Sequence, residues 1–258
     1  MNDNYQLIKG NCLEVMIDLF NQKGEFVDFI FADPPYFLSN GGITCQNGKM
    51  VKVDKGNWDS SQGPELNHQF NIEWLKRCQN LLKPNGTIMV SGTSHIIYSI
   101  GFAMQLLGMK TLNNITWVKP NPPPNLACKY FTHSTETIIW AAKTLESKHF
   151  YNYDLMKSLN ENKQMKDVWK IPSPKKEEKK YGKHPTQKPL QLLNKIILAA
   201  TEKDGLILDP FNGSGTTGVA SIINNRKYIG IELEDKFLLL SKKRFQNIKK
   251  DLFGNLDA

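Results

Sequence analysis

The chain has 258 residues, 40% of them hydrophobic, which is enough for one α/β domain with a complete core. No apolar run approaches the ~20 residues that span a bilayer, and no signal peptide is recognisable. We therefore expect a cytoplasmic protein with no membrane partner. Lys and Arg total 33 against 25 Asp and Glu, and the net charge of +8 favours a polyanionic partner only slightly over simple solubility. The four cysteines are scattered, so we expect reduced thiols, no disulfide framework and no metal site.

Helices and strands alternate in the predicted order of elements. Apolar residues at helical spacing predict helices over 13–20, 73–82, 98–107, 189–201, 216–224 and 235–250. Short apolar runs bounded by turn residues predict strands over 27–32, 87–90, 115–118, 137–141, 206–208 and 228–231. Repeated strand-then-helix units favour a mostly parallel, doubly wound sheet in a single catalytic domain, residues 1–258. Segments 37–70 and 146–183 depart from this rhythm, and unstructured stretches of such length are usually functional or disordered.

Residues 31–36 read Phe-Ala-Asp-Pro-Pro-Tyr, directly after the apolar strand expected at 27–32. Two consecutive prolines lack the N–H groups that a sheet ladder needs, so we expect the strand to end at Asp33. The ending leaves a carboxylate, stiffened carbonyl groups and an aromatic ring at the carboxyl edge of the sheet, where open α/β sheets bind ligands. A rigid corner rich in acceptors suits a planar amine such as a nucleobase. The alternative is an Asp-Pro turn with a purely structural role.

A glycine-rich turn lies near the carboxyl end. Gly213, Gly215 and Gly218 form G-x-G-x-x-G between an expected strand and an expected helix, and Glu232 follows 19 residues after Gly213. This arrangement is typical of nucleoside-cofactor sites with an acidic residue on the ribose, although a glycine turn can also merely join a strand to a helix. No Lys follows the glycines, which disfavours a P-loop for ATP. The carboxylate of Asp209 would repel a pyrophosphate but attract a cation, which favours S-adenosylmethionine over NAD.

Three motifs, in this order, resemble those of β-class amino-group DNA methyltransferases. They are the catalytic motif at 33–36, the segment His184-Pro185-Thr186-Gln187-Lys188-Pro189, and the cofactor loop at 209–217. The resemblance spans nearly the whole chain. It implies an α/β, Rossmann-like S-adenosylmethionine-dependent methyltransferase fold with a permuted motif order, in which the catalytic motif precedes the cofactor loop.

Three segments are similar to the DpnA-type second methylase of DpnII-like GATC restriction-modification systems. They read D-P-P-Y-F-L-S-N-G-G-I at 33–43, F-T-H-S-T-E-T-I at 131–138 and Q-M-K-D-V-W at 164–169. The similarity implies methylation of adenine N6 in GATC, in double-stranded and also single-stranded DNA. It further implies a cognate restriction endonuclease as a functional partner and a homodimer.

The resemblance also implies roles for individual residues. Catalysis is expected from Asp33, Pro34, Pro35 and Tyr36: Asp33 and the Pro34 carbonyl accept hydrogen bonds from adenine N6, and Tyr36 stacks on the flipped base. The residues expected to bind S-adenosylmethionine are Asn11, Cys12, Asp33, Thr186, Gln187, Lys188, Asp209, Pro210, Phe211, Asn212, Gly213, Ser214, Gly215, Thr216, Thr217 and Glu232. The residues expected at the target base or the DNA are Lys129, Tyr130 and Phe131.

DNA recognition is expected from the two irregular segments, 37–70 and 146–183. Phosphate contacts there are expected from Lys49, Lys52, Lys55, Lys175, Lys176, Lys179 and Lys180. Asn11 stands where family members often have an acidic residue, and it fits a helix N-cap as well as a cofactor contact. His184, beside a glycine and a proline, is interpreted as a turn or packing histidine.

Other functions stay open at this point. Cytosine-N4 methylation uses a similar motif that more often begins with Ser, and methylation of protein glutamine or RNA usually has Asn in place of Asp33. An NAD-dependent oxidoreductase is disfavoured by Asp209-Pro210 and by the lack of a plausible hydride site. A DNA-binding protein without activity is disfavoured by the intact motifs. His133, Ser134 and Glu136 have a local spacing that does not fit a hydrolase triad.

Overall fold

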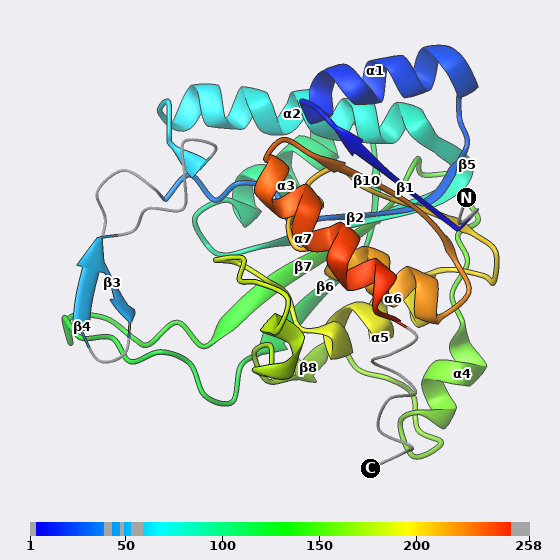
Figure 1. Cartoon of the computed structure of the whole chain (residues 1–258). Helices are drawn as coiled ribbons and strands as arrows, with labels where there is room; N and C mark the ends of the chain where they lie inside the picture. The colour runs from blue at the N-terminus through cyan, green and yellow to red at the C-terminus, as the bar shows by residue number, and fades with distance from the viewer. Residues whose placement is uncertain (1–3, 39–42, 47–48, 53–58, 249–258) are drawn as a thin grey trace.

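An eight-stranded sheet forms the centre of the molecule in the computed structural model, which describes residues 4–38, 43–46, 49–52 and 59–248 (Figure 1). Its strands, in spatial order, are β1 (Tyr5–Lys9), β10 (Lys227–Glu232), β9 (Leu206–Asp209), β2 (Val27–Ala32), β5 (Leu82–Gly92), β7 (Thr135–Ala142), β6 (Lys110–Val118) and β8 (Val168–Lys170). The first five are parallel, whereas β7 runs antiparallel to both of its neighbours. A separate antiparallel hairpin consists of β3 (Ile43–Gln46) and β4 (Lys49–Lys52).

Helices cover both faces of the sheet. One face carries α1 (Cys12–Lys23), α2 (Pro64–Leu81) and α3 (Ile97–Leu106). The other carries α4 (Tyr153–Ser158), α5 (Leu190–Ala200), α6 (Thr216–Ile223) and α7 (Asp235–Gln246). A short 3-10 helix spans Glu177–Lys179. Two hydrophobic cores result, one on each side of the sheet.

Strand β2 shows why the sheet is buried on both sides. Ile30 and Ala32 point into the core under α1 and α2, while Phe29 and Phe31 point into the opposite core. All four side chains are almost completely buried. A strand covered on both faces reads as a continuous apolar run, which is the pattern that predicted it. Helix α1 begins at the N-cap Asn11, whose side chain accepts a hydrogen bond from the Leu13 amide at 2.9 Å.

The structure confirms the mostly parallel, doubly wound sheet, and each predicted helix and strand is present. Several boundaries were wrong. The strand expected at 87–90 begins earlier, since β5 starts at Leu82, and α2 begins at Pro64, so 37–70 is not irregular throughout. Segment 146–183 contributes α4 and the edge strand β8, neither of which was predicted; β1 and the hairpin were also missed. Among the described helices, none is long and apolar enough to cross a membrane.

Part of the segment expected to contact DNA lies outside the described residues. These are 39–42, 47–48 and 53–58, which include Lys55. The end of the carboxyl-terminal helix expected to reach residue 250 also falls partly outside, since the description stops at residue 248. The DNA-contacting roles of 37–70 and 146–183 stay predictions.

Candidate active site

The carboxyl edge of the sheet collects the polar groups of the site. Four adjacent parallel strands, β1, β10, β9 and β2, end at this edge, and they end at or next to Asn11, Glu232, Asp209 and Asp33. Because β7 runs antiparallel, its amino end reaches the same edge and brings Glu136 there. Chain segments far apart in the sequence thereby place four carboxylates at one end of the sheet.

A cavity of about 240 Å³ opens at this edge. Its wall includes every residue expected to bind the cofactor except Gly215. Apolar surface in the wall comes from Phe70, Phe211 and Phe237. The Oε1 atom of Gln187, another wall residue, is buried and has no hydrogen-bond partner among the described residues. The cavity thus combines aromatic walls, acidic groups and an unused acceptor, a lining that suits a polar, partly cationic ligand with an aromatic ring.

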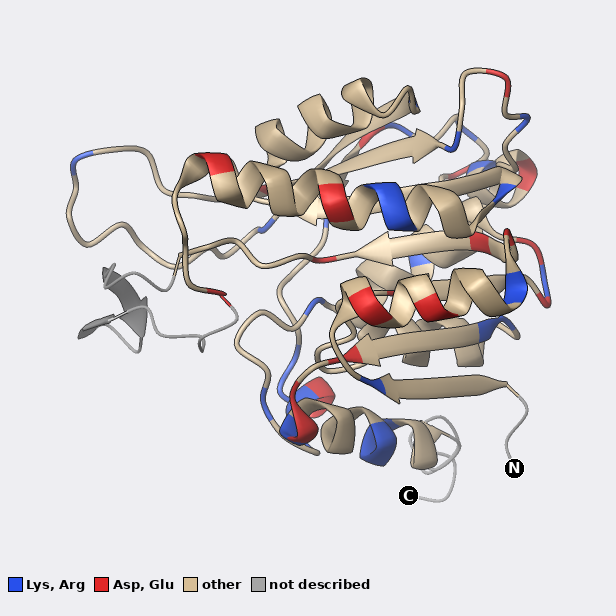
Figure 2. Cartoon of the chain, turned by 90° about the horizontal axis from the view of Figure 1, so that it is seen from above, with Lys and Arg blue, Asp and Glu red and all other residues tan. Residues whose placement is uncertain are grey.

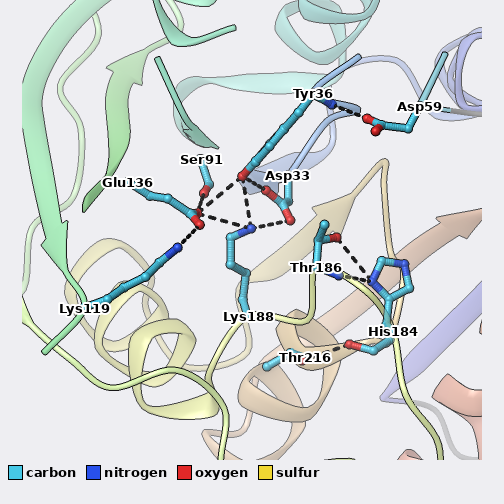
Figure 3. Close-up of polar contacts among 11 residues, drawn as sticks. Asp33, Tyr36, Asp59, Ser91, Lys119, Glu136, His184, Thr186, Lys188 and Thr216 are labelled. Atoms are coloured by element: carbon cyan, nitrogen blue, oxygen red, sulfur yellow. Dashed lines mark hydrogen bonds and ion pairs between the residues drawn. The ribbon is translucent and has the colours of Figure 1, made fainter. Parts of the chain in front are cut away.

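The catalytic motif beside the cavity is tied into a network of charges (Figure 3). Lys188 Nζ donates to Asp33 Oδ2 at 2.5 Å and to the Tyr36 hydroxyl at 3.1 Å. The Tyr36 hydroxyl donates to Asp33 Oδ1 at 2.7 Å, so both Asp33 oxygens have a partner. Glu136 Oε2 lies 3.5 Å from Lys188 Nζ, and Glu136 Oε1 accepts from Lys119 Nζ at 2.5 Å. Charges alternate along this line: Asp33, Lys188, Glu136, Lys119.

Burial and neighbouring charges set the pKa values in this network. Burial raises the pKa of Asp33, and the Lys188 ammonium opposes that rise. Burial acts in the same direction on Glu136, but Lys188 and Lys119 outweigh it and lower the pKa of this carboxyl. The pKa of Lys188 is raised, because Asp33 and Glu136 outweigh the effect of burial. Burial and the two carboxylates raise the pKa of Tyr36 well above its usual value, so Tyr36 stays a hydrogen-bond donor.

Asp59 fixes the turn that follows the catalytic motif. This carboxylate is fully buried and accepts hydrogen bonds from the backbone amides of Tyr36 (2.8 Å), Phe37 (2.9 Å) and Leu38 (3.2 Å). Asp59 is 23 residues from Tyr36 in the sequence, and it closes the excursion that contains β3 and β4.

The glycine loop is built around two acidic side chains. Glu232 accepts hydrogen bonds from the Gly213 amide at 2.7 Å and from the Glu234 amide at 2.8 Å. Asp209 accepts from the Phe211 amide at 3.0 Å. Burial raises the pKa of Asp209 to about 7, although hydrogen bonds to its charged form oppose the rise. Asp209 is therefore a carboxyl group that changes charge near neutral pH.

His184 has the packing role expected from its sequence context. Its Nδ1 lies 3.3 Å from both the amide nitrogen and the hydroxyl oxygen of Thr186. The ring packs edge-on against Phe237, with centroids 4.2 Å apart. A Cβ at Gly213 would lie 3.1 Å from His184 Nε2, so the absence of a side chain there lets the ring approach the glycine loop.

Gly215 is not placed where we expected it. It has φ +71°, and a Cβ there would lie 2.7 Å from Ser241 Oγ and 3.0 Å from Phe245 Cε1. The residue faces α7 and does not line the cavity, so its glycine serves a left-handed turn and close helix packing. Gly215 was expected among the residues that bind the cofactor, and it is the one of them that does not line the cavity, so its contact with the cofactor stays a prediction.

The remaining predicted residues have mixed placements. Pro34 and Tyr36 adjoin the cavity without lining it. Lys188, expected to bind the cofactor, lines the cavity but directs its ammonium to Asp33, Tyr36 and Glu136. Tyr130 and Phe131 lie with Lys129 in the connection between β6 and β7 and are 60% and 96% exposed, so neither aromatic belongs to the core. Basic and acidic residues are interspersed over several elements in the view of Figure 2.

Sequence reasoning missed Ser91, Lys119, Glu136 and Asp59 as residues of the site. The first three come from β5, the residue after β6, and β7, and strand pairing brings them together. Ser91 and Lys119 donate to Glu136, which in turn contacts Tyr36 and Lys188. A usable signal was present for Glu136, since a carboxylate inside an apolar strand is costly to bury without a partner. Among the described residues, no cluster of His, Cys, Asp and Glu is suited to hold a metal ion.

The fold and the cavity together define an α/β protein of the class that binds nucleoside cofactors, with an acidic corner beside the cavity. The chain belongs to the N6/N4 DNA methylase family, whose model matches residues 27–243. It is 52% identical over 245 residues to the type II methyltransferase M2.MboI of Moraxella bovis, covering 95% of this chain and 89% of that one. It is 56% identical over 229 residues to M2.DpnII of Streptococcus pneumoniae, covering 88% and 85%.

Solved structures agree with the fold. The M1.HpyAVI–SAM complex superposes with a TM-score of 0.71 at 29% identity and covers 93% of this chain and 98% of that one. The PvuII DNA methyltransferase, described as cytosine-N4-specific, superposes with a TM-score of 0.73 at 20% identity, covering 97% and 92%. The latter likeness concerns the fold alone. The predicted methyltransferase fold is thereby confirmed.

Proposed function

We propose that this protein transfers a methyl group from S-adenosylmethionine to N6 of a flipped adenine in DNA, within GATC. The observation that carries the proposal is the position of Asp33-Pro34-Pro35-Tyr36 at the end of β2, bordering an acid-lined cavity. The relatives named M2.MboI and M2.DpnII support the assignment to a type II restriction-modification system. A cognate endonuclease is then a functional partner.

The residues of the cavity fit S-adenosylmethionine. Asp209 and Glu232 supply acidic groups for a ligand that carries an ammonium, a sulfonium and ribose hydroxyls. The buried Oε1 of Gln187 offers an acceptor, and Phe70, Phe211 and Phe237 offer apolar surface for an adenine ring. Bound S-adenosylmethionine supplies a methyl group activated by a positively charged sulfur. The M1.HpyAVI structure, at 29% identity, was obtained as a complex with SAM.

Asp33 is the acceptor that makes the adenine amine reactive in this proposal. The N6 lone pair is delocalised into the ring, and hydrogen bonds from both N6 protons to Asp33 and the Pro34 carbonyl favour a more tetrahedral, more nucleophilic nitrogen. The two consecutive prolines fix the Pro34 carbonyl before the substrate arrives, so this acceptor needs little reorganisation. Before the amine binds, Lys188 donates to Oδ2 of Asp33. Glu136 lies 3.5 Å from the Lys188 ammonium and is an alternative partner for this ammonium when the substrate amine takes its place at Asp33.

The target base must leave the double helix to reach this corner. Flipping costs a few kcal/mol and is least costly for an unpaired base, which fits activity on single strands as well. The exposed rings of Tyr130 and Phe131 in the β6–β7 connection are available for contact with the extruded base or its neighbours. Lys129 in the same connection would contact phosphate.

Transfer of labelled methyl groups tests the proposal. We expect label on duplexes and single strands that contain GATC, no label on the same sequence with GATC scrambled, and no label with Asp33→Ala. Absence of label from every DNA would refute methyl transfer to DNA. Label on the scrambled duplex alone would refute GATC as the site while leaving the DNA methylase family intact.

A further inference from the structure

We infer that Asp59 is a positioning residue for methyl transfer, an inference that rests on the function proposed above. Its fully buried carboxylate accepts three consecutive backbone amides, those of Tyr36, Phe37 and Leu38, at 2.8, 2.9 and 3.2 Å. Charge-assisted hydrogen bonds of this kind are about twice as strong as neutral ones. One side chain therefore fixes the backbone immediately after the catalytic motif.

The turn that Asp59 holds has an unfavourable backbone conformation. Phe37 has φ +56°, in the left-handed region, which is unfavourable for a bulky side chain. Such a conformation persists only where surrounding contacts impose it. The Phe37 amide donates to Asp59 Oδ1, and the Phe37 ring packs edge-on against Phe70 at 6.1 Å. Loss of the Asp59 carboxylate would remove three hydrogen bonds that hold this turn in place.

The turn is linked to the reacting corner through Tyr36. The Tyr36 amide donates to Asp59, and its hydroxyl donates to Asp33 Oδ1 at 2.7 Å (Figure 3). The Tyr36 hydroxyl also accepts from Lys188 at 3.1 Å. A shift of the Tyr36 backbone would therefore change the orientation of the carboxylate that accepts from the substrate amine. Asp59 acts through Tyr36 and is not itself a catalytic residue.

The position of Asp59 in the chain gives this contact a second consequence. Tyr36 and Asp59 stand on either side of the segment that contains the hairpin of β3 and β4, and the hydrogen bond between them joins the two ends of that segment. The excursion proposed to contact DNA is thus anchored at both ends on one cluster of hydrogen bonds.

Asp28 provides a matched control. This residue of β2 also accepts a backbone amide, that of Leu206 at 2.8 Å, and pairs with Lys83 at 2.7 Å. It lies five residues before Asp33, and its side-chain contacts among the described residues are with Leu206 and Lys83, outside the catalytic network. Asp28→Asn should therefore lower stability without changing the rate of methyl transfer in folded protein.

The test compares Asp59→Ala, Asp59→Asn and Asp28→Asn by steady-state kinetics on GATC duplexes, calorimetric affinity for S-adenosylmethionine, and thermal unfolding. We expect kcat to fall about 100-fold in Asp59→Ala, the cost typical of a small misplacement of reacting groups. Asp59→Asn keeps one acceptor oxygen, so its kcat should fall less. Affinity for S-adenosylmethionine should be unchanged in both. Should Asp59→Ala fail to fold, Asp59→Asn still gives the required comparison of kcat with stability.

Three results would overturn the inference. The first is an unchanged kcat in both Asp59 variants, and the second is an equal fall of kcat in Asp28→Asn. The third is a loss of S-adenosylmethionine affinity that accounts for the whole fall of activity in the Asp59 variants. Failure of the proposed function is distinct from these, because the unaltered protein would then transfer no methyl group to GATC DNA.

Discussion

Replacing Lys188 by Met tests how the charges of the active site are balanced. The Lys188 ammonium is shared by Asp33 and Glu136, and the side chains of these three residues are only 7%, 14% and 9% exposed. Met keeps a similar volume and removes the charge. Glu136 retains Lys119 as a partner, whereas Asp33 retains the Tyr36 hydroxyl and no cation in the described network.

The expected loss of stability follows from this burial. Removing one partner of a buried ion pair costs about 3–5 kcal/mol, because the remaining charge is left uncompensated. Without the opposing charge of Lys188, burial of the Asp33 carboxyl raises its pKa further above its ordinary value. A carboxyl whose folded-state pKa exceeds its unfolded value weakens the fold at high pH, and the penalty shrinks as pH falls through the folded pKa. Lys188→Met should therefore be more destabilising at about pH 8 than at about pH 5.

Urea unfolding at the two pH values measures the effect. Adding Asp33→Asn to Lys188→Met removes the orphaned charge and should recover much of the lost free energy of unfolding at the higher pH. Lys163→Met is the control, since Lys163 forms an exposed pair with Glu161 and its loss should cost no more than about 1 kcal/mol. Two results would refute this description of the network. One is a free energy of unfolding of Lys188→Met equal to that of the unaltered protein at both pH values, and the other is no regain of that free energy in the double variant.

Three further expectations concern the cofactor cavity, the glycine loop and DNA binding. Because the pKa of Asp209 is about 7, affinity for the cationic S-adenosylmethionine should rise from about pH 6 to about pH 8 in calorimetry. Asp209→Asn should remove that rise. Equal affinities of the unaltered protein at both pH values would contradict attraction of the cofactor by the charged Asp209 carboxylate. Gly215→Ala should lower the free energy of unfolding by about 2–5 kcal/mol, the sum of backbone strain and overpacking against Ser241 and Phe245. An unchanged melting temperature would refute this expectation. DNA affinity should fall steeply with salt if several lysines contact phosphates, and a flat response would argue against those contacts.

Local signals in the sequence predicted the parts of the site that depend on strand ends. Consecutive prolines end β2 at Asp33, and the glycine loop follows β9 at Asp209, so both carboxylates were placed correctly at the carboxyl edge. Glu232 at the end of β10 followed from the same rule. These signals need only the neighbouring residues, which is why single-sequence reasoning finds them.

The parts that were missed depend on long-range pairing. Glu136 reaches Tyr36 only because β7 runs antiparallel to β5, and Asp59 reaches the same residue across the excursion of 37–58. The early start of α2 had a local signal, Pro64 at the first turn, but its polar residues hid the helical pattern. Gly215 was expected at the cofactor from the motif alone. Its close packing against Ser241 and Phe245 of α7 depends on residues outside the motif.

Nucleoside analysis of methylated DNA tests the central claim most directly. A duplex with one GATC site is incubated with the protein and S-adenosylmethionine, digested to nucleosides and analysed by mass spectrometry. The proposed chemistry at Asp33 predicts N6-methyladenine, absent when Asp33→Ala replaces the unaltered protein. N4-methylcytosine in its place, or no methylated nucleoside, would contradict the account.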